Sequence, residues 1–155
     1  MCGNSKDPRL VCSFCDIFLN EMALGKSPDS IKGYLVDIEG RKCIVLNSDL
    51  PEDMQIQVLW HEIGHAFMHP SLEGSATAYG CADPDEKEAN LFSAEYQLSD
   101  EEVLSALRNN DVFICAKQLN VPYQVLDYKI RMLRAKGYNL PELPIYTADR
   151  YLGKI

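Results

Sequence analysis

Long apolar runs and basic leader segments are both missing from this sequence of 155 residues. No stretch approaches the roughly 20 apolar residues that a membrane-spanning helix requires. The first 19 residues hold a short apolar patch without the basic segment of a secretory signal, so we expect a mature protein that stays in the cytoplasm. Internal repeats and low-complexity tracts are also missing, and the length predicts one domain, residues 1–155, with a hydrophobic core.

Cysteine is present, but its pattern does not indicate a metal site. Without a secretory signal we expect all six cysteines to be reduced thiols. Cys12 and Cys15 have half of a zinc-site spacing, but no second pair of metal-ligating residues at such a spacing follows. We therefore interpret both as small buried residues of a helix.

The net charge of −8 is unevenly distributed. Residues 1–110 contain 8 basic and 19 acidic side chains, whereas residues 111–136 contain 5 basic and 2 acidic ones. An acidic body repels phosphate groups, so we do not expect direct nucleic-acid binding. The basic segment 111–136 is a candidate docking surface.

The order of the predicted elements indicates an α+β fold, with a small antiparallel sheet followed by helices. Two β-rich runs flank Glu39-Gly40 and predict a hairpin, and Ser99 with Glu102 forms a capping-box pattern that opens a helix. We expect strands at 33–38 and 42–47, a loop at 70–84, and helices at 10–24, 51–69, 85–98, 100 onward, 112–119 and 122–136.

Histidine is scarce, and all three histidines lie within residues 61–69. His61 and His65 are four residues apart on a predicted helix, which places both imidazoles on one face where they can bind a single ion. Glu62 lies next to the first histidine and can act as the general base for water attacking a peptide carbonyl. The run His61-Glu62-Ile63-Gly64-His65 therefore predicts the centre of a zinc peptidase. A glycine inside this helix costs about 1 kcal/mol, which a close backbone contact at Gly64 would explain.

A catalytic zinc site of this kind needs a third protein ligand. His69 lies about 12 Å from His61 along a straight helix, which is too far for one ion, so we interpret His69 as a helix-end residue that could contact substrate. A carboxylate remains, and Glu86 ranks first because Asn90 follows one turn later on the same face. The carboxylates considered are Glu73, Asp83, Asp85, Glu86, Glu88 and Glu95. Spacing gives no argument for the group that stabilises the oxyanion, for which Tyr34, Tyr79, Tyr96 and His69 are candidates.

Three segments, in order, resemble the ImmA/IrrE-type metallopeptidases: IKGYLVDIEGRKCIVLNSDLP at 31–51, HEIGHAFMHP at 61–70 and EKEANLFSAEYQL at 86–98. The resemblance covers most of residues 30–135. It implies a zincin-like domain with a catalytic core at about 30–100. As in gluzincins such as thermolysin, it implies that His61, His65 and Glu86 bind one zinc ion and that Glu62 is the general base. Manganese or iron could replace zinc at such a site.

The resemblance also implies a protein substrate. Members of this family, found in phages, other mobile elements and some stress-tolerant bacteria, cleave a helix-turn-helix repressor, so we expect regulated cleavage of such a repressor here. The alternative is a metal-bearing antirepressor that binds and sequesters the repressor without cutting it. Residues 111–136 resemble a helix-turn-helix pair, for which packing against the catalytic core, docking of the repressor and contact with DNA stay open.

Overall fold

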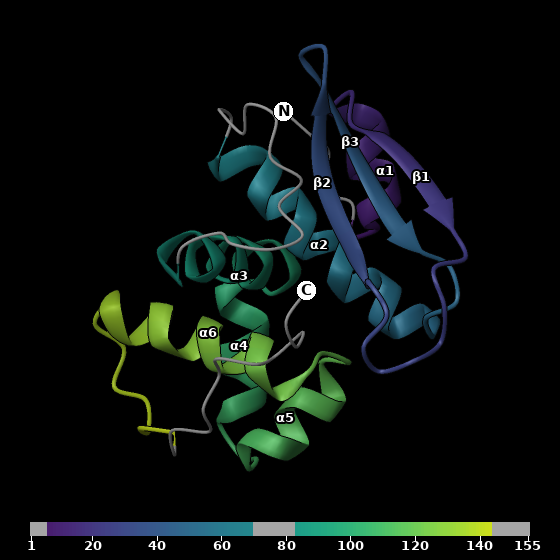
Figure 1. Ribbon diagram of the computed structural model, residues 1–155. Helices are drawn as coiled ribbons and strands as arrows, with labels where there is room; N and C mark the ends of the chain where they lie inside the picture. The colour runs from purple at the N-terminus through teal and green to yellow at the C-terminus, as the bar shows by residue number, and fades with distance from the viewer. Residues whose placement is uncertain (1–5, 70–82, 144–155) are drawn as a thin grey trace. The chain divides into compact units, whose positions relative to one another are not determined.

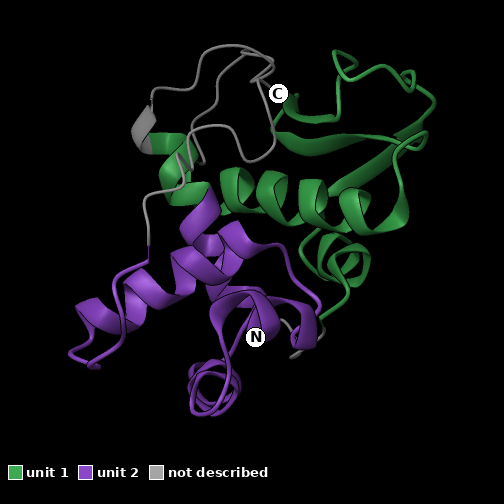
Figure 2. Ribbon diagram, turned by 90° about the horizontal axis from the view of Figure 1, so that it is seen from below, with its two compact units in different colours: residues 1–89, 154–155 green, residues 90–153 purple. Residues whose placement is uncertain are grey.

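The computed structural model describes residues 6–69 and 83–143 of the chain. The chain forms two compact units, one of residues 1–89 with 154–155 and the other of residues 90–153 (Figure 2). The predicted loop at 70–84 lies almost entirely outside the described residues. Each unit is described by itself below.

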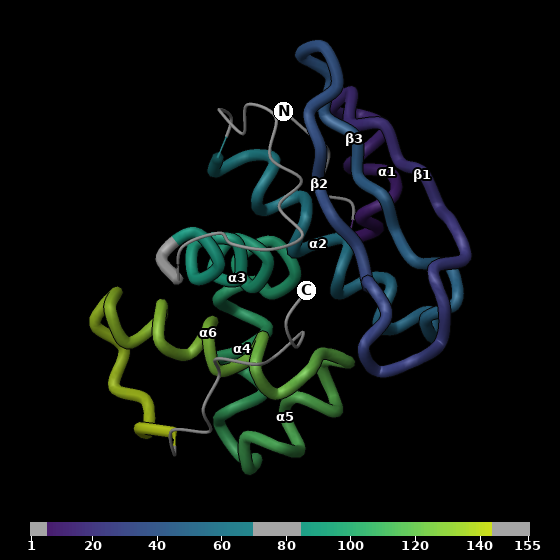
Figure 3. Tube along the Cα trace, viewed as in Figure 1, coloured from purple at the N-terminus to yellow at the C-terminus, as the bar shows by residue number. Residues whose placement is uncertain are grey.

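The predicted hairpin is confirmed in the first unit. Strand β2 (Gly33–Ile38) pairs antiparallel with β3 (Arg41–Asn47), and the chain reverses between them in a tight turn (Figure 3). Glu39 and Gly40 have φ angles of 54° and 80°, as a turn with two left-handed residues requires. Such a turn matches the twist of the two strands, which is why a glycine lies at its second position.

The predicted helix at 10–24 is wrong in its second half. Helix α1 covers only Pro8–Phe14, and residues Phe18–Met22 form strand β1, which runs parallel to β3. Asp7 caps the helix by accepting a hydrogen bond from the Arg9 amide. Asp16 then takes a left-handed φ of 54°, which ends any helical path. The sheet has the order β1-β3-β2 and is therefore mixed, not purely antiparallel.

One face of this sheet is covered by α1 and by the long helix α2, Glu52–Met68 (Figure 1). Side chains alternate across a strand, and Leu35, Ile44 and Leu46 point toward the helices and are buried. The helices contribute apolar side chains that are almost completely buried: Val11, Cys12, Val58, Leu59, Trp60 and Ile63. Burial of these side chains is the main force that holds α2 on the sheet.

A single arginine joins the elements around α1. The guanidinium of Arg9 donates hydrogen bonds to Glu21 in β1 and to Glu52 and Gln55 at the start of α2.

The described part of the second half of the chain is mostly helical. Helix α3 is Asp83–Gln97, α4 is Asp100–Leu107, α5 is Val112–Gln118 and α6 is Tyr123–Ala135. These helices confirm the predicted ones to within a few residues.

In the second unit the predicted capping box is present at the start of α4. Ser99 accepts a hydrogen bond from the Glu102 amide, and the Glu102 carboxylate accepts one from the Ser99 amide. Helices α4, α5 and α6 pack on one another around a buried apolar cluster. The cluster is made of Ala94, Leu98, Val103, Cys115, Ala116, Val125, Leu126, Tyr128, Ile130 and Leu133.

The basic residues of α6 and its C-terminal end are paired with carboxylates. Lys129 is only 1% exposed, and its ammonium lies 2.5 Å from Glu95 and 2.7 Å from Asp100. The other three basic residues form ion pairs as well: Arg131 with Asp127, Arg134 with Glu142, and Lys136 with Glu95 and Asp100. Most of the positive charge of residues 111–136 is therefore neutralised by these neighbouring carboxylates.

Candidate metal centre

Three side chains of the first unit converge on one point. The Nε2 atoms of His61 and His65 lie 3.1 Å apart. The carboxylate of Glu86 lies 3.1 Å from the first of these nitrogens and 3.2 Å from the second. Among the described residues, these three side chains form the one cluster of metal-ligating groups, with the ligand atoms all within 4.8 Å of one another.

These distances suit a tetrahedral zinc ion. Zinc bonds to imidazole nitrogen and carboxylate oxygen are about 2.0–2.2 Å long, so two ligand atoms of a tetrahedral site lie roughly 3.3 Å apart. The observed separations of 3.1 and 3.2 Å are close to this value. Both histidines are 2% exposed, and two imidazoles with a carboxylate are the ligand set of many catalytic zinc sites.

The electrostatics of Glu86 agree with a ligand role. Burial by itself raises the pKa of the Glu86 carboxyl, but the hydrogen bonds from His61 and His65 outweigh it and hold the pKa well below its ordinary value. The carboxylate is therefore charged at neutral pH and available to a cation.

Glu62 lies beside the cluster in a different environment. Its side chain is 2% exposed, and burial raises its pKa above the ordinary value, while the neighbouring histidines and a backbone hydrogen bond from Leu35 act in the opposite direction. Its Oε2 atom has no hydrogen-bond partner among the described residues. A buried carboxylate oxygen without a partner is costly, and a reacting water or peptide group is the kind of partner that would satisfy it.

A glycine explains how α3 comes close enough to supply Glu86. A Cβ atom built on Gly64 would lie 2.7 Å from the carbonyl oxygen of Ala89 and 3.0 Å from its Cα. The two helices therefore touch backbone to backbone at this point. The close contact expected at Gly64 from the sequence is confirmed, and it sets α3 at the distance where Glu86 meets the two histidines.

A second glycine and one backbone amide at the site were missed by sequence reasoning. A Cβ on Gly33 would lie 2.6 Å from the Val58 side chain, so the start of β2 packs tightly on α2. Two residues later, the Leu35 amide is the donor to the Glu62 carboxylate. The predicted strand alone cannot reveal the contact between the Leu35 amide and Glu62. The glycine at the start of that strand, Gly33, was nevertheless a signal of close packing in the sequence.

The remaining candidate residues fall in other places. Asp85 and Glu88 lie near His69, whose ring stands 5.6 Å from that of His65. Glu95 pairs with Lys129 in the second unit. The strand register puts Tyr34 on the sheet face opposite Leu35. The candidates Glu73 and Tyr79 and the side chain of Asp83 lie outside the described part of the chain.

Cys12 is 1% exposed in the core, as expected, whereas Cys15 lies just after the last residue of α1 and is partly exposed. Burial raises the pKa of the Cys12 thiol to about 12. A metal-binding cysteine must be a thiolate, so this environment agrees with the interpretation of Cys12 as a buried apolar residue.

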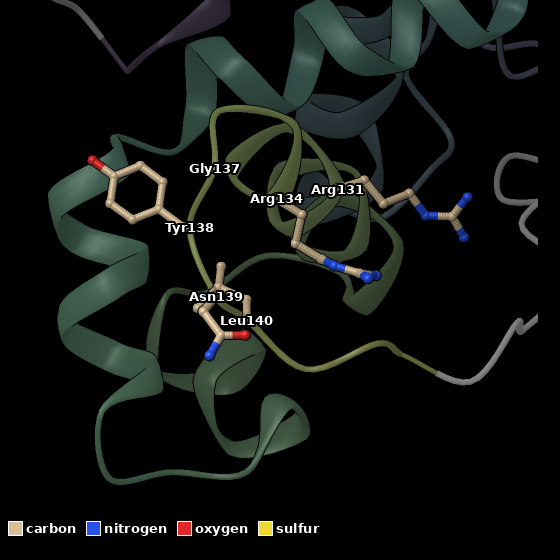
Figure 4. Close-up of a pocket in the computed structure, with 6 residues that line it drawn as sticks. All are labelled: Arg131, Arg134, Gly137, Tyr138, Asn139 and Leu140. Atoms are coloured by element: carbon tan, nitrogen blue, oxygen red, sulfur yellow. The ribbon is translucent and has the colours of Figure 1, made fainter.

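The second unit has a shallow hollow of its own at the end of α6. Arg131, Arg134, Gly137, Tyr138, Asn139 and Leu140 line it, and its volume is about 540 Å³ (Figure 4). Figure 4 shows the tyrosine ring pointing to the side opposite the two guanidinium groups. No residue of the His61, His65 and Glu86 cluster belongs to this hollow.

The comparisons with known proteins assign the family. The family model Peptidase_M78, described as an IrrE N-terminal-like domain, matches residues 14–131. The chain belongs to this family. The resemblance stated from the three sequence segments is confirmed, and the Peptidase_M78 assignment supports a metallopeptidase-type function. No curated protein and no solved structure matches the chain. Within the described part of this Peptidase_M78 member, none of the helices has the length and apolar character needed to cross a membrane.

Proposed function

We propose that this chain is a zinc-dependent endopeptidase that cleaves a helix-turn-helix transcriptional repressor. The observation that carries the proposal is the convergence of the His61 and His65 Nε2 atoms and the Glu86 carboxylate, with the buried Glu62 carboxylate beside them. Two histidines and a glutamate leave one position of a tetrahedral site open, as hydrolysis requires. Membership of the Peptidase_M78 family supports the same chemistry.

His61, His65 and Glu86 would hold the ion. Zinc, when bound, supplies a Lewis acid that polarises a carbonyl and makes water a better nucleophile at neutral pH. For both Nε2 atoms to offer lone pairs to one point, each ring must carry its proton on Nδ1. The buried position of both rings excludes bulk water and keeps their orientation fixed.

Glu62 would move the proton. Its carboxylate accepts a proton from the attacking water as the new C–O bond forms at the scissile carbonyl. The same proton then passes to the amide nitrogen as the C–N bond breaks, so that an acid and an amine leave the site. A raised pKa suits this exchange, because a carboxylate of ordinary pKa holds a proton too weakly at neutral pH.

The outer strand β2 offers a place for the substrate backbone. Within the described sheet, β2 pairs with β3 on one side only, and its Leu35 amide already reaches Glu62. An extended peptide that binds along such an edge forms main-chain hydrogen bonds with the strand. These bonds provide affinity for peptides of many sequences, and pockets for the side chains determine which sequences bind best. We propose that the repressor segment binds in this extended form.

The choice of a repressor as substrate rests on the family resemblance, and a cleavage assay tests it. Wild-type protein and the variants Glu62→Gln and Glu101→Gln are purified, their zinc is measured per chain, and each is incubated with the repressor encoded nearest to this gene. Glu101 is exposed on α4, so its variant is a matched control for the chemical change. We expect one zinc ion per chain and a discrete cut by the wild type and the control only.

The other outcomes are informative as well. Loss of cleavage in Glu62→Gln with zinc retained assigns Glu62 as the base, whereas equal cleavage by that variant refutes the assignment. Zinc with a stable, uncut complex would support the antirepressor alternative instead. A wild type without metal would overturn the ligand set His61, His65 and Glu86.

A further inference from the structure

His69 lies where α2 ends, two turns after the first histidine of the cluster. Its backbone amide donates a hydrogen bond to the His65 carbonyl at 3.0 Å, which closes the last turn of the helix. The ring is tilted by 44° against the His65 ring, with the centroids 5.6 Å apart. Its side chain is only 16% exposed, so it is not a freely moving surface group.

The His69 side chain contacts the first turns of α3. Its Nε2 atom lies 3.3 Å from the carbonyl oxygen of Asp85. Because a carbonyl can only accept, Nε2 must carry the proton and donate it. The ring nitrogens also lie 3.8 Å from the carboxylates of Asp85 and Glu88. These two residues flank Glu86, one position before it and two positions after it.

Glu86 needs such support more than the two histidines do. His61 and His65 are buried side chains of the long helix α2, whereas the Glu86 side chain is 40% exposed and belongs to the first turns of α3. The first turn of a helix has backbone amides without intrahelical partners and frays readily. A long, flexible side chain reaches a fixed point only if its own backbone is held.

We propose that His69 is a positioning residue for the metal site. It fixes the backbone at Asp85, and the neighbouring Glu86 then directs its carboxylate at the two histidines. This inference rests on the proposed function, because it assumes that Glu86 binds the metal. Groups that orient a metal ligand in this way commonly contribute 10–100-fold to metal affinity.

Zinc affinity of three variants tests the proposal without any assay of cleavage. The dissociation constant is measured by competition with a chelator, and cobalt absorption reports the coordination of the ion. We expect His69→Ala to bind zinc about 10–100-fold more weakly and to change the cobalt spectrum. His69→Gln keeps a donor near the Nε2 position and should recover most of the affinity. Met68→Ala removes the adjacent, 45% exposed side chain and should bind like the wild type.

A double-variant comparison separates positioning from general loosening. If His69 acts through Glu86, then His69→Ala should weaken zinc binding in the wild type but add nothing in a Glu86→Gln background. Equal weakening in both backgrounds would overturn the inference. If His69→Ala does not fold, His69→Met replaces it, because this variant keeps the bulk and removes the donor.

The experiment also separates the two claims. A wild type that binds no zinc contradicts the proposed function itself. A wild type that binds zinc, with His69→Ala binding just as tightly, contradicts the positioning role of His69 alone.

Discussion

Gly64→Ala is the substitution that most directly tests how the proposed metal site is assembled. The new methyl group would lie 2.7 Å from the carbonyl oxygen and 3.2 Å from the carbonyl carbon of Ala89. Both are backbone atoms and cannot rotate away. An ordinary contact begins near 3.4 Å, so α3 would have to move by about 0.7 Å.

Two effects on stability oppose each other in this variant. Alanine inside a helix is favoured over glycine by about 1 kcal/mol, while overpacking at a tight contact costs about 1–3 kcal/mol. The net change in the free energy of unfolding is therefore a loss of about 0–2 kcal/mol. Zinc affinity is the sharper measurement, because ligand distances must be correct to within about 0.2 Å and the shift exceeds this.

We expect Gly64→Ala to weaken zinc binding by at least about tenfold, as a disturbed ligand support does. Titration of the metal-free protein against a chelator measures the change. Gly137→Ala is the control: its φ of +98° makes alanine strained, but a Cβ there meets nothing within 4 Å and lies in the other unit. It should lower stability and leave zinc affinity unchanged. Unchanged affinity in Gly64→Ala would refute the claim that this contact places Glu86.

Three further predictions concern the cores and the charged groups. Trp60→Ala should lower the free energy of unfolding by about 3–5 kcal/mol in a urea titration, because the side chain is only 1% exposed. Hydrogen bonds from Lys129 and Lys136 lower the pKa of Asp100. The stability that they provide is therefore present above the ordinary pKa of an aspartate and is lost as the pH falls through the lowered pKa of the folded protein. In Asp100→Asn, the free energy of unfolding should therefore fall less steeply as the pH is lowered. Iodoacetamide at pH 8 should leave Cys12 unmodified in the folded protein, since burial raises its pKa to about 12, and modification at the rate of an exposed thiol would contradict its burial.

Local signals predicted most of the fold correctly. The hairpin follows from two β-rich runs around Glu39-Gly40, and the helix α4 follows from the capping box at Ser99 and Glu102. Strand β1 was missed because its pairing partner lies 25 residues further along the chain, as in Phe18 with Cys43. A parallel partner at that distance leaves no periodic mark on the strand itself, and the apolar residues 17–19 continued the helical pattern.

The same distinction applies to the candidate site. His61, Glu62 and His65 lie on one helix, so their spacing alone predicts a shared face. Glu86 could only be ranked, because its approach to the histidines depends on the backbone contact between Gly64 and Ala89. Buried Lys129 was interpreted as part of a basic surface, since the carboxylates that surround it are 29 and 34 residues away in the chain.

The buried polar atoms of the metal centre have a consequence for selection. Glu62 Oε2 and His65 Nδ1 have no hydrogen-bond partner among the described residues, and each such atom costs about 1–3 kcal/mol in the folded state. Apolar residues at these positions would therefore make the protein harder to unfold while removing the proposed chemistry. Directed evolution that rewards thermal endurance alone should consequently replace these two residues early, and their retention in a natural population would be evidence of selection for the proposed activity.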